Sequence, residues 1–307
     1  MPSYLVTGGA GFIGSHLVET LRARGDGVRV LDDLSTGRRD NLPRDVELFV
    51  GDVADRGLVE RAIAGTDGCF HLAAVASVAK ANEEWLATHR SNLTGAIAVF
   101  DCARKARGGR PIPVVYASSA AVYGDNPQVP LAESAAARPL TAYGADKLGC
   151  ELHARVACHV HGVPTVGLRF FNVFGPRQDP KSPYSGVIAI FAGLLKAGSP
   201  ITINGDGLQT RDFVYVADVV GHLSAAMARA SLDAEVFNVC TGRETTVLDL
   251  ATSIAATLGA KAEIRHGPAR AGDIRISRGD PSRAIRALGL EAKTALAEGL
   301  KPTLAWV

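Results

Sequence analysis

Cysteine is scarce in this chain, and its arrangement argues against a metal centre. The five cysteines, Cys69, Cys102, Cys150, Cys158 and Cys240, form no Cys-x-x-Cys pair and show no cysteine–histidine spacing typical of zinc. Dispersed thiols are typical of proteins that stay in a reducing compartment. We therefore expect free cysteines, no metal and a cytoplasmic location.

Long apolar runs and charge of one sign are also missing. No window approaches the length of a membrane span, and the apolar residues at the N-terminus give way at once to glycines, unlike those of a secretory leader. Lys and Arg number 33 against 31 Asp and Glu. The longest basic cluster, 104–110, is broken by Gly108 and Gly109. These features predict a soluble protein that binds neither membranes nor nucleic acid.

What the chain does contain is a regular alternation of apolar runs and helical patterns. Runs such as "YLVTG", "VRVLDD", "GCFHLAA" and "IPVVYASS" are separated by stretches with apolar residues at helical spacing, such as "IGSHLVETLRARG". Near-continuous hydrophobic strands separated by helices are typical of a parallel sheet covered on both faces. We therefore predict an α/β fold with a doubly wound parallel sheet.

After about Phe174 this alternation loosens, and loop-rich stretches such as "GPRQDPKSP" and "INGDGLQTRD" appear. We expect this part of the chain to build a smaller α/β lobe over the carboxyl edge of the sheet. The predicted domains are residues 1–172 and 173–307, with some exchange of strands and helices between them. In doubly wound sheets, ligands bind at that edge, where the strand order reverses.

Three glycines at three-residue spacing, Gly8, Gly11 and Gly14, lie in "LVTGGAGFIGSHL" between an expected strand and a helix that begins near Phe12. Gly8 allows the tight turn, Gly11 lets a pyrophosphate approach the backbone, and Gly14 lets helix and strand pack closely. The N-terminus of the helix offers unpaired N–H groups and a favourable dipole to phosphate. This context predicts a dinucleotide site.

Acidic residues end the next two expected strands. Asp32 and Asp33 follow the glycine loop at about the spacing of a ribose-binding acid. A carboxylate there accepts hydrogen bonds from the ribose hydroxyls and repels a 2′-phosphate, which favours NAD over NADP. Arg38 and Arg39 follow closely and are interpreted as surface residues. Asp52 is placed to face the adenine, or alternatively to cap its own strand end.

A serine pair and a Tyr–Lys pair are candidates for the chemistry. Ser118 and Ser119 end the strand in "YASSAAVYG", and Tyr143 and Lys147 are four residues apart in "YGADK", on one face of a helix. The charge of Lys147 would stabilise the phenolate of Tyr143 as a base for a hydroxyl proton, and Ser119 would orient that hydroxyl. The simpler alternatives are an exposed helix pair and a strand-end turn.

Further motifs run over nearly the whole chain: "HLAA" (71–74), "RFFNVFGPRQDP", "GDGLQTRDFVYVAD" and "RAGD" (270–273). With this set the sequence resembles the extended short-chain dehydrogenase/reductases, and within them the UDP-sugar 4-epimerases. The resemblance implies a Rossmann domain with tightly held NAD, a C-terminal lobe for a nucleotide sugar, and a homodimer formed by two helices per subunit. The apolar faces of the helices expected around 93–102 and 148–158 suit either such an interface or the core.

The resemblance also implies roles for individual residues. Ser119 and Tyr143 would flank the sugar 4-hydroxyl, Lys147 would hold the nicotinamide ribose, and Lys80 would contact the cofactor phosphate. Asn172, Arg211 and Arg270 match positions that bind the UDP diphosphate, a role that suits arginine. Asn92 matches a family asparagine, or packs inside its helix. The full expected cofactor set is Gly8, Gly11, Phe12, Ile13, Gly14, Asp32, Asp33, Ser35, Thr36, Gly37, Asp52, Val53, Leu72, Ala73, Ala74, Lys80, Ser118, Tyr143 and Lys147.

The two alanines after Ser119 restrict which reaction of this family the chain could catalyse. Related dehydratases carry an Asp-Glu pair at this point and related decarboxylases a glutamate, whereas this chain has Ala120 and Ala121, which do no acid–base work. The expected reaction is therefore hydride removal at C4 and its return to the other face of a 4-keto sugar. The competing hypotheses are a net oxidoreductase and a dinucleotide-sensing regulator without activity.

The sugar is predicted from one position. In the family, the seventh residue after the arginine of "RxGD" limits the room around the C2 substituent, and here it is Ser277. A small side chain leaves space for an N-acetyl group but does not reject UDP-glucose. A UDP-uronic acid is the alternative, with Arg177 and Ser185 placed to meet its carboxylate unless Arg177 is a surface ion-pairing residue.

Overall fold

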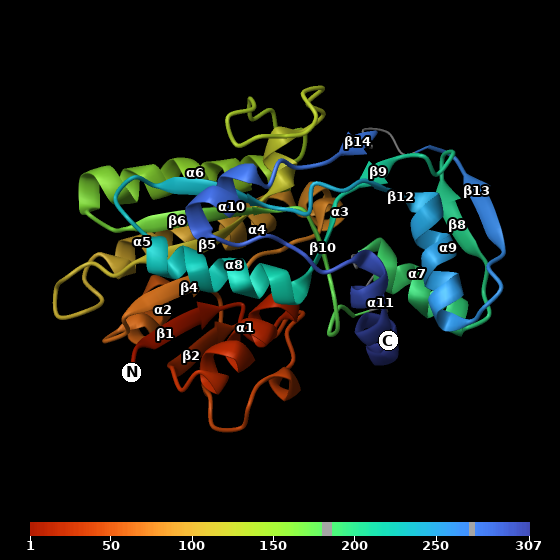
Figure 1. The fold of residues 1–307 in the computed structure, drawn as a ribbon. Coiled ribbons are helices and arrows are strands. Elements are labelled where there is room, and N and C mark those ends of the chain that lie inside the picture. Colours follow the sequence, from red (N-terminus) through yellow and green to blue (C-terminus); the bar gives the residue numbers. More distant parts are fainter. Residues whose placement is uncertain (180–185, 270–273) are drawn as a thin grey trace.

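Seven parallel strands form the sheet of the larger of two lobes (Figure 1). The computed structural model describes residues 1–179, 186–269 and 274–307. In spatial order the strands are β11 (Glu235–Val239), β6 (Thr165–Phe170), β5 (Val114–Ser119), β4 (Gly68–His71), β1 (Ser3–Thr7), β2 (Gly27–Asp32) and β3 (Glu47–Val50). The order reverses between β1 and β4, which is where such sheets bind ligands. The predicted doubly wound α/β fold is confirmed.

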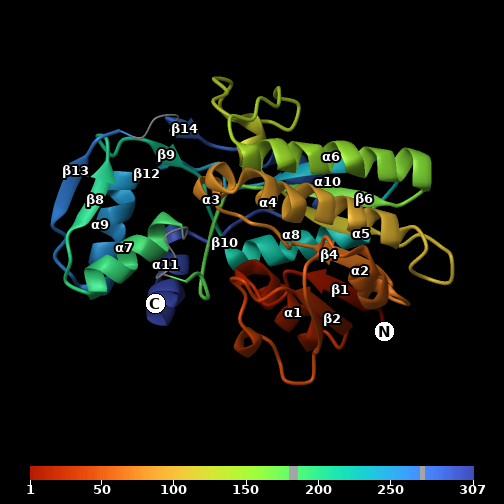
Figure 2. The same ribbon diagram turned by 180° about the vertical axis from the view of Figure 1, so that it is seen from behind.

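Helices cover both faces of this sheet. One face carries α1 (Phe12–Ala23), α8 (Val216–Arg229) and α10 (Ser282–Leu288), and the other carries α2 (Arg56–Ile63), α5 (Gly95–Ala103) and α6 (Ala142–His161). Figure 2 shows α5 and α6 side by side. Leu5 and Val6, successive residues of β1, are both fully buried but lie in different cores. The near-continuous apolar runs therefore follow from side chains that alternate between two covered faces.

Shorter elements complete the larger lobe on the side of the carboxyl edge. They are α3 (Val78–Glu83), α4 (Trp85–His89), a π-helical turn (Arg90–Thr94) and two 3-10 turns (Arg39–Asn41 and Ala120–Tyr123). Each of these segments either follows a sheet strand or leads into α5. They consequently surround the edge at which the predicted cofactor residues lie.

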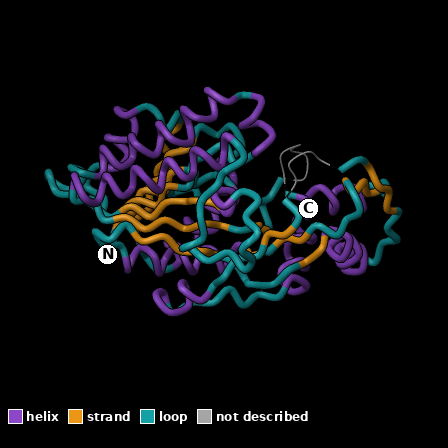
Figure 3. The backbone as a smooth tube through the Cα atoms, turned by 90° about the horizontal axis from the view of Figure 1, so that it is seen from above, coloured by secondary structure: helices purple, strands orange, loops and turns teal. Residues whose placement is uncertain are grey.

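The smaller lobe has its own core. Its helices are α7 (Val187–Lys196), α9 (Val247–Leu258) and α11 (Leu296–Trp306), and they bury residues such as Phe191, Leu250 and Leu300. Its strands are the parallel pair β8 (Ile201–Asn204) and β13 (Ile264–Gly267), and the three-stranded sheet β12 (Thr245–Thr246), β9 (Thr210–Arg211) and β14 (Ile276–Ser277). A further parallel pair is formed by β7 (Asn172–Phe174) and β10 (Phe213–Tyr215), and Figure 1 shows β10 between the lobes. Figure 3 shows the main sheet from above, with helices along both of its faces.

The chain passes between the lobes several times. After β7 it builds α7 to β9 in the smaller lobe, and α8 and β11 then return to the larger one. It leaves again for β12 to β14 and returns with α10. The expected division into residues 1–172 and 173–307 stays a prediction. Three elements of residues 173–307, α8, β11 and α10, pack on the larger lobe. No helix in the described residues is long and apolar enough to cross a membrane.

Candidate active site

The glycine loop is closed against its neighbours so tightly that side chains would not fit. Gly8 has φ +69°, and a Cβ there would lie 2.7 Å from the nitrogen of Ala73, after β4. A Cβ on Gly14 would lie 2.1 Å from the carbonyl oxygen of Gly8. Gly11 precedes α1, and no described side chain caps that N-terminus. The first amides of α1 are thus available to an anion, as the sequence predicts.

Of the two acids after β2, Asp32 is the one that lies against the glycine loop. Its Oδ2 accepts from the Ala10 amide at 2.9 Å and its Oδ1 from the Leu34 amide at 2.9 Å. Burial raises the pKa of Asp32, and these two hydrogen bonds act in the opposite direction. Asp33 is exposed and accepts from the amide and hydroxyl of Ser35 within its own turn. Asp32 is therefore the better candidate for the ribose.

Of the other cofactor candidates that follow β2 and β3, some lie in exposed loops and others are buried. Thr36 is exposed. Gly37 is buried, and a Cβ there would be too close to Asp32 Oδ1, at 2.8 Å. Asp52 accepts from Ala54 N at 2.8 Å and from Arg90 Nε at 3.1 Å, so it is held within its own turn and by an arginine. Val53 is a core residue. The adenine role of Asp52 stays a prediction.

The side chains of Arg38 and Arg39 have protein partners away from the glycine loop, although the main-chain amide of Arg38 donates to Ala10 O at 3.0 Å. Arg38 pairs with Asp179 at 3.2 Å, and Arg39 donates to main-chain carbonyls of the following turn. These contacts agree with their interpretation as surface residues.

Thr7 and His71 hold the loop after β4. Neither residue was assigned a role from the sequence. Thr7 Oγ1 exchanges a hydrogen bond with His71 Nδ1 at 2.8 Å and accepts one from Ala73 N at 3.2 Å. The Leu72 amide donates to Thr7 O at 3.1 Å. Burial, followed by the charge of Lys147, lowers the pKa of His71 to about 3. Thr7, bonded to this neutral histidine, thus holds the amides of Leu72 and Ala73 beside the glycine loop, and Ala74 follows them in sequence. The only signal in the sequence was the position of His71 in "HLAA".

The Tyr–Lys pair lies on α6, whose first turn packs on the segment after β5. The Nζ of Lys147 donates to the Ala117 carbonyl at 2.9 Å and lies 5.8 Å from the ring centre of Tyr143. A Cβ on Gly144 would lie 2.6 Å from Ala121 O. Because Ala121 also donates its amide to Ser119 Oγ at 3.1 Å, the contact brings Tyr143 to the end of β5 that carries Ser119.

Ser118 is directed away from this pair, into a buried polar network. Its Oγ donates to Glu151 Oε1 at 2.5 Å, and Glu151 forms two hydrogen bonds with Arg169, of 2.8 and 2.7 Å. Arg169 also donates to the hydroxyl of Tyr123 at 2.9 Å. The hydroxyl proton of Ser118 is thus committed to Glu151, so its side chain could meet the cofactor only as an acceptor. Glu151 and Arg169 were not among the residues predicted from the sequence, although Glu151 follows Lys147 by one helical turn.

The predicted substrate residues that the structure describes lie at the junction of the lobes. Asn172 begins β7 and donates its amide to Asp212 O at 2.9 Å. Arg211 in β9 donates from Nη1 to the carbonyls of Thr210 and Ile274, both at 2.7 Å. Ser277 is buried in β14. Arg270 and Ser185 lie outside the described residues.

Three other candidates have clear surroundings. Lys80 on α3 is partly exposed, with Nζ 3.7 Å from Glu84. Asn92 is buried and binds both the amide and the carbonyl of Val75, so it holds the loop after Ala74. Arg177 pairs with Glu19 of α1 and donates to Ser15 Oγ at 3.1 Å. That pairing favours the surface interpretation of Arg177 over the uronate one.

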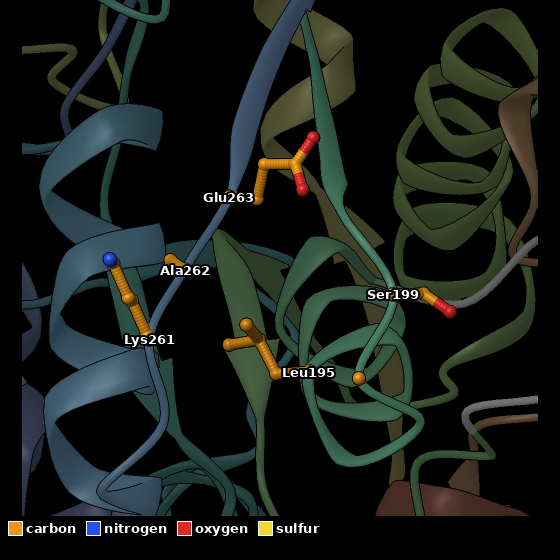
Figure 4. A pocket seen from close by; sticks show the side chains of 6 residues that line it. Leu195, Ser199, Lys261, Ala262 and Glu263 are labelled. Atoms are coloured by element: carbon orange, nitrogen blue, oxygen red, sulfur yellow. The ribbon is translucent and has the colours of Figure 1, made fainter.

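A surface pocket of about 450 Å³ lies apart from these residues, in the smaller lobe. It is formed by the end of α7 and the segment before β13, with Leu195, Ser199 and Glu263 among its residues (Figure 4). None of the described candidate residues lines it, so we assign it no part in the site. No group of three or more His, Cys, Asp and Glu residues suited to a metal occurs in the described ranges.

Comparison with known proteins decides the family. The NAD dependent epimerase/dehydratase family matches residues 4–240. The chain belongs to this family. The resemblance read from the sequence is thereby confirmed, and the cofactor is NAD. The residues fit that cofactor, because the cradle at Gly8 and Gly14 excludes side chains and the buried Asp32 accepts from the Ala10 amide of the glycine loop.

Relatives in the family are similar over almost their whole length. The chain is 39% identical to a UDP-glucose 4-epimerase of Mycolicibacterium smegmatis, over 98% of this chain and 96% of that protein. A structure of a UDP-glucose 4-epimerase from Thermotoga maritima with UDP-glucose has a TM-score of 0.93 and 37% identity, covering 99% and 98% of the two chains. A UDP-N-acetylglucosamine 4-epimerase from Methanobrevibacter ruminantium, solved with UDP-N-acetylmuramic acid, has a TM-score of 0.93 and 33% identity, covering 99% and 97%.

Proposed function

We propose that this protein interconverts the C4 epimers of a UDP-sugar through a 4-keto sugar. The observation that carries the proposal is the close packing of Gly144, the residue after Tyr143, on the carbonyl of Ala121, whose own amide donates to Ser119 Oγ at the carboxyl end of β5. Lys147, anchored on the Ala117 carbonyl, is the buried cation nearest to that tyrosine ring among the described residues. The relatives named above support the reaction class.

Each residue then has a stated task. Tyr143 takes the proton of the sugar 4-hydroxyl, while Ser119 holds the oxygen in place through its own hydroxyl. NAD, held by the glycine loop and Asp32, would supply a hydride acceptor and donor for C4. Lys147 keeps positive charge beside the phenolate. When the 4-keto sugar has turned about its diphosphate linkage, Tyr143 gives the proton back to O4, so atoms and electrons balance with no net redox change.

Ala120 and Ala121 distinguish the proposed epimerisation from the dehydration and decarboxylation that related enzymes carry out. Elimination of water or loss of carbon dioxide needs an acid or base near C5 or C6, and a methyl side chain is neither. The alanines follow Ser119 in a 3-10 turn that is partly buried. The sugar intermediate is therefore left with return of the hydride as its remaining route.

The sugar we propose is UDP-glucose, UDP-N-acetylglucosamine or both. Arg211 and Asn172, with Arg270, would bind the diphosphate, and Ser277 would lie near the C2 substituent. Because Ser277 is small, the space around the C2 substituent of the sugar would accept an N-acetyl group without excluding a plain hexose. The uronate alternative is less well supported, because Arg177 is paired with Glu19 and Ser15.

A substrate panel without added NAD tests the proposal. Purified protein is incubated separately with UDP-glucose, UDP-N-acetylglucosamine and UDP-glucuronate, and each product is identified by NMR. We expect a C4 epimer of the same mass from at least one of the first two. A product lighter by water or carbon dioxide would contradict the proposal, and absorbance of reduced cofactor with stoichiometric NAD would favour a net oxidoreductase.

We also propose a homodimer through α5 and α6. Leu152, Val156 and Val160 are spaced four residues apart on α6 and are 55%, 47% and 68% exposed. Ile97 of α5 and Val156 line one shallow groove between the two helices. Such an apolar stripe on neighbouring helices suits pairing with a second copy. Light scattering after size exclusion should give twice the monomer mass, and Val156→Asp should give the monomer. A monomeric parent protein would contradict this.

A further inference from the structure

Asp212 lies between β9 and β10, fully buried, and four donors surround its carboxylate. Oδ1 accepts from the amide of Thr241 at 2.8 Å and from its hydroxyl at 2.7 Å. Oδ2 accepts from Gly242 N at 2.8 Å and from Gly279 N at 3.4 Å. The side chain therefore joins its own segment to two others that are distant in sequence.

Each of the joined segments leads to a candidate substrate residue or to the main sheet. Arg211 precedes Asp212, and Ser277 is two residues before Gly279. The main-chain carbonyl of Asp212 accepts from Asn172 N at 2.9 Å. Thr241 follows β11, the last strand of the seven-stranded sheet. Figure 1 shows β9 and β14 on the smaller lobe and β10 between the lobes.

The joined segments are also packed too closely to shift independently. A Cβ on Gly279 would lie 2.5 Å from Cys240 Sγ and 2.7 Å from the ring of Phe171. Gly242 has φ +73°, which the turn after Thr241 requires. The positions of the β14 segment and of the turn are thus set by contacts around Asp212.

A carboxylate suits this place and its amide isostere does not. Burying a charge is unfavourable unless hydrogen bonds compensate it, and burial is the main cause that raises the pKa of Asp212. A carboxylate has acceptor oxygens on both sides, as four converging donors require. An asparagine would direct an NH₂ group at the donors on one side. The asparagine would therefore lose the hydrogen bond from the Thr241 main-chain amide or those from Gly242 and Gly279.

We propose that Asp212 is a positioning residue for the nucleotide sugar, which holds Arg211, Asn172 and Ser277 in fixed register with one another and with the main sheet. The inference rests on the proposed function and deepens it. Asp212 acts through these residues and does not itself touch the substrate. It determines where the diphosphate-binding residues stand relative to the residue beside the sugar.

The test compares Asp212→Asn with Asp206→Asn. Asp206 is an exposed acid of the same lobe, paired with Arg275, and serves as the matched acid-to-amide control. Titration calorimetry measures UDP affinity, and turnover gives kcat and KM for UDP-glucose and UDP-N-acetylglucosamine. We expect Asp212→Asn to weaken UDP binding and raise KM at least about tenfold, with bound NAD per subunit unchanged. Asp206→Asn should stay within about twofold of the parent, as for a surface pair.

A second variant covers the case in which Asp212→Asn does not fold. Thr241→Val keeps the amide donor to Asp212 and removes the hydroxyl, which also accepts from Arg243 N at 3.2 Å. It should therefore fold and weaken UDP binding about threefold to tenfold. UDP affinity equal to the parent in folded Asp212→Asn, or in Thr241→Val if the former does not fold, would overturn the inference and leave the proposed function standing. A parent protein that binds no UDP would overturn both.

Discussion

Ser277 and Arg211 are direct partners across the parallel strands β14 and β9. The residue expected to limit room around the sugar is therefore held beside one expected to bind the diphosphate. Since Ser277 is almost fully buried, a larger side chain there has to occupy space next to Arg211 rather than solvent.

Replacing Ser277 with tyrosine should therefore change sugar preference. We expect kcat/KM for UDP-N-acetylglucosamine to fall about tenfold or more relative to that for UDP-glucose, since one misfitting group changes discrimination by about 1–3 kcal/mol. Ser277→Ala is the control, and its ratio of the two values should equal that of the parent. An equal loss on both sugars in Ser277→Tyr would refute this role.

Removing the hydroxyl of Tyr143 should abolish proton transfer and leave cofactor binding intact. In Tyr143→Phe we expect kcat to fall about 10²–10⁴-fold, the usual contribution of a positioned acid–base group. Bound NAD should be unchanged, because the ring and the anchoring of Lys147 on Ala117 stay in place. Tyr4→Phe, at the far end of β1, is the control. Turnover above a tenth of the parent's would remove Tyr143 from the mechanism.

A methyl group on Gly14 should displace the glycine loop. The Cβ would lie 2.1 Å from Gly8 O, so Gly14→Ala should purify without NAD or fail to fold, as absorbance and thermal unfolding would show. Gly57→Ala is the matched control, because in α2 the added Cβ meets nothing closer than 3.4 Å. Its helix should gain up to about 1 kcal/mol. Normal NAD content in Gly14→Ala would contradict the proposed cradle.

The buried His71 should make stability depend on pH in a defined window. Its pKa is lowered to about 3, so the unfolded chain binds a proton below about pH 6.5 that the folded chain does not. The associated stability is complete above about pH 6.5 and declines toward pH 3, by at most about 1.4 kcal/mol per pH unit.

Urea unfolding between pH 7 and 4.5 measures this effect. His71→Asn keeps a short polar partner for Thr7 and removes the titrating ring, so its free energy of unfolding should fall less steeply over this range. Contributions of other groups cancel in the difference between the two proteins. Parallel pH profiles would show that His71 does not have this role.

The sheet and the glycine loop were predictable because their causes are local. Leu5 and Val6 are buried on opposite faces, so an uninterrupted apolar run follows from sheet position alone. The cradle depends on three glycines within seven residues, all visible in one stretch of sequence. The i and i+4 positions of Tyr143 and Lys147 likewise need only helical geometry.

The remaining features depend on contacts between distant segments. Successive side chains of a strand point to opposite faces, so Ser118 and Ser119 were not equivalent candidates, but which one faced the site required the helix carrying Glu151. Arg169 and Asp212 were read only as parts of longer motifs. Their partners, Glu151 and Gly279, lie 18 and 67 residues away, beyond the reach of any periodic pattern.

The repeated passage of the chain between the lobes has a consequence for synthesis. Strand β11 and helix α10 complete the larger lobe, yet β11 follows α7, β8 and β9 of the smaller lobe in the sequence, and α10 follows all of that lobe's elements except α11. A nascent chain that has emerged only as far as residue 172 presents β6 as an open edge strand with no partner on that side. The nucleotide-binding half therefore reaches its final form only when the ribosome has made nearly the whole protein, and the two lobes mature together.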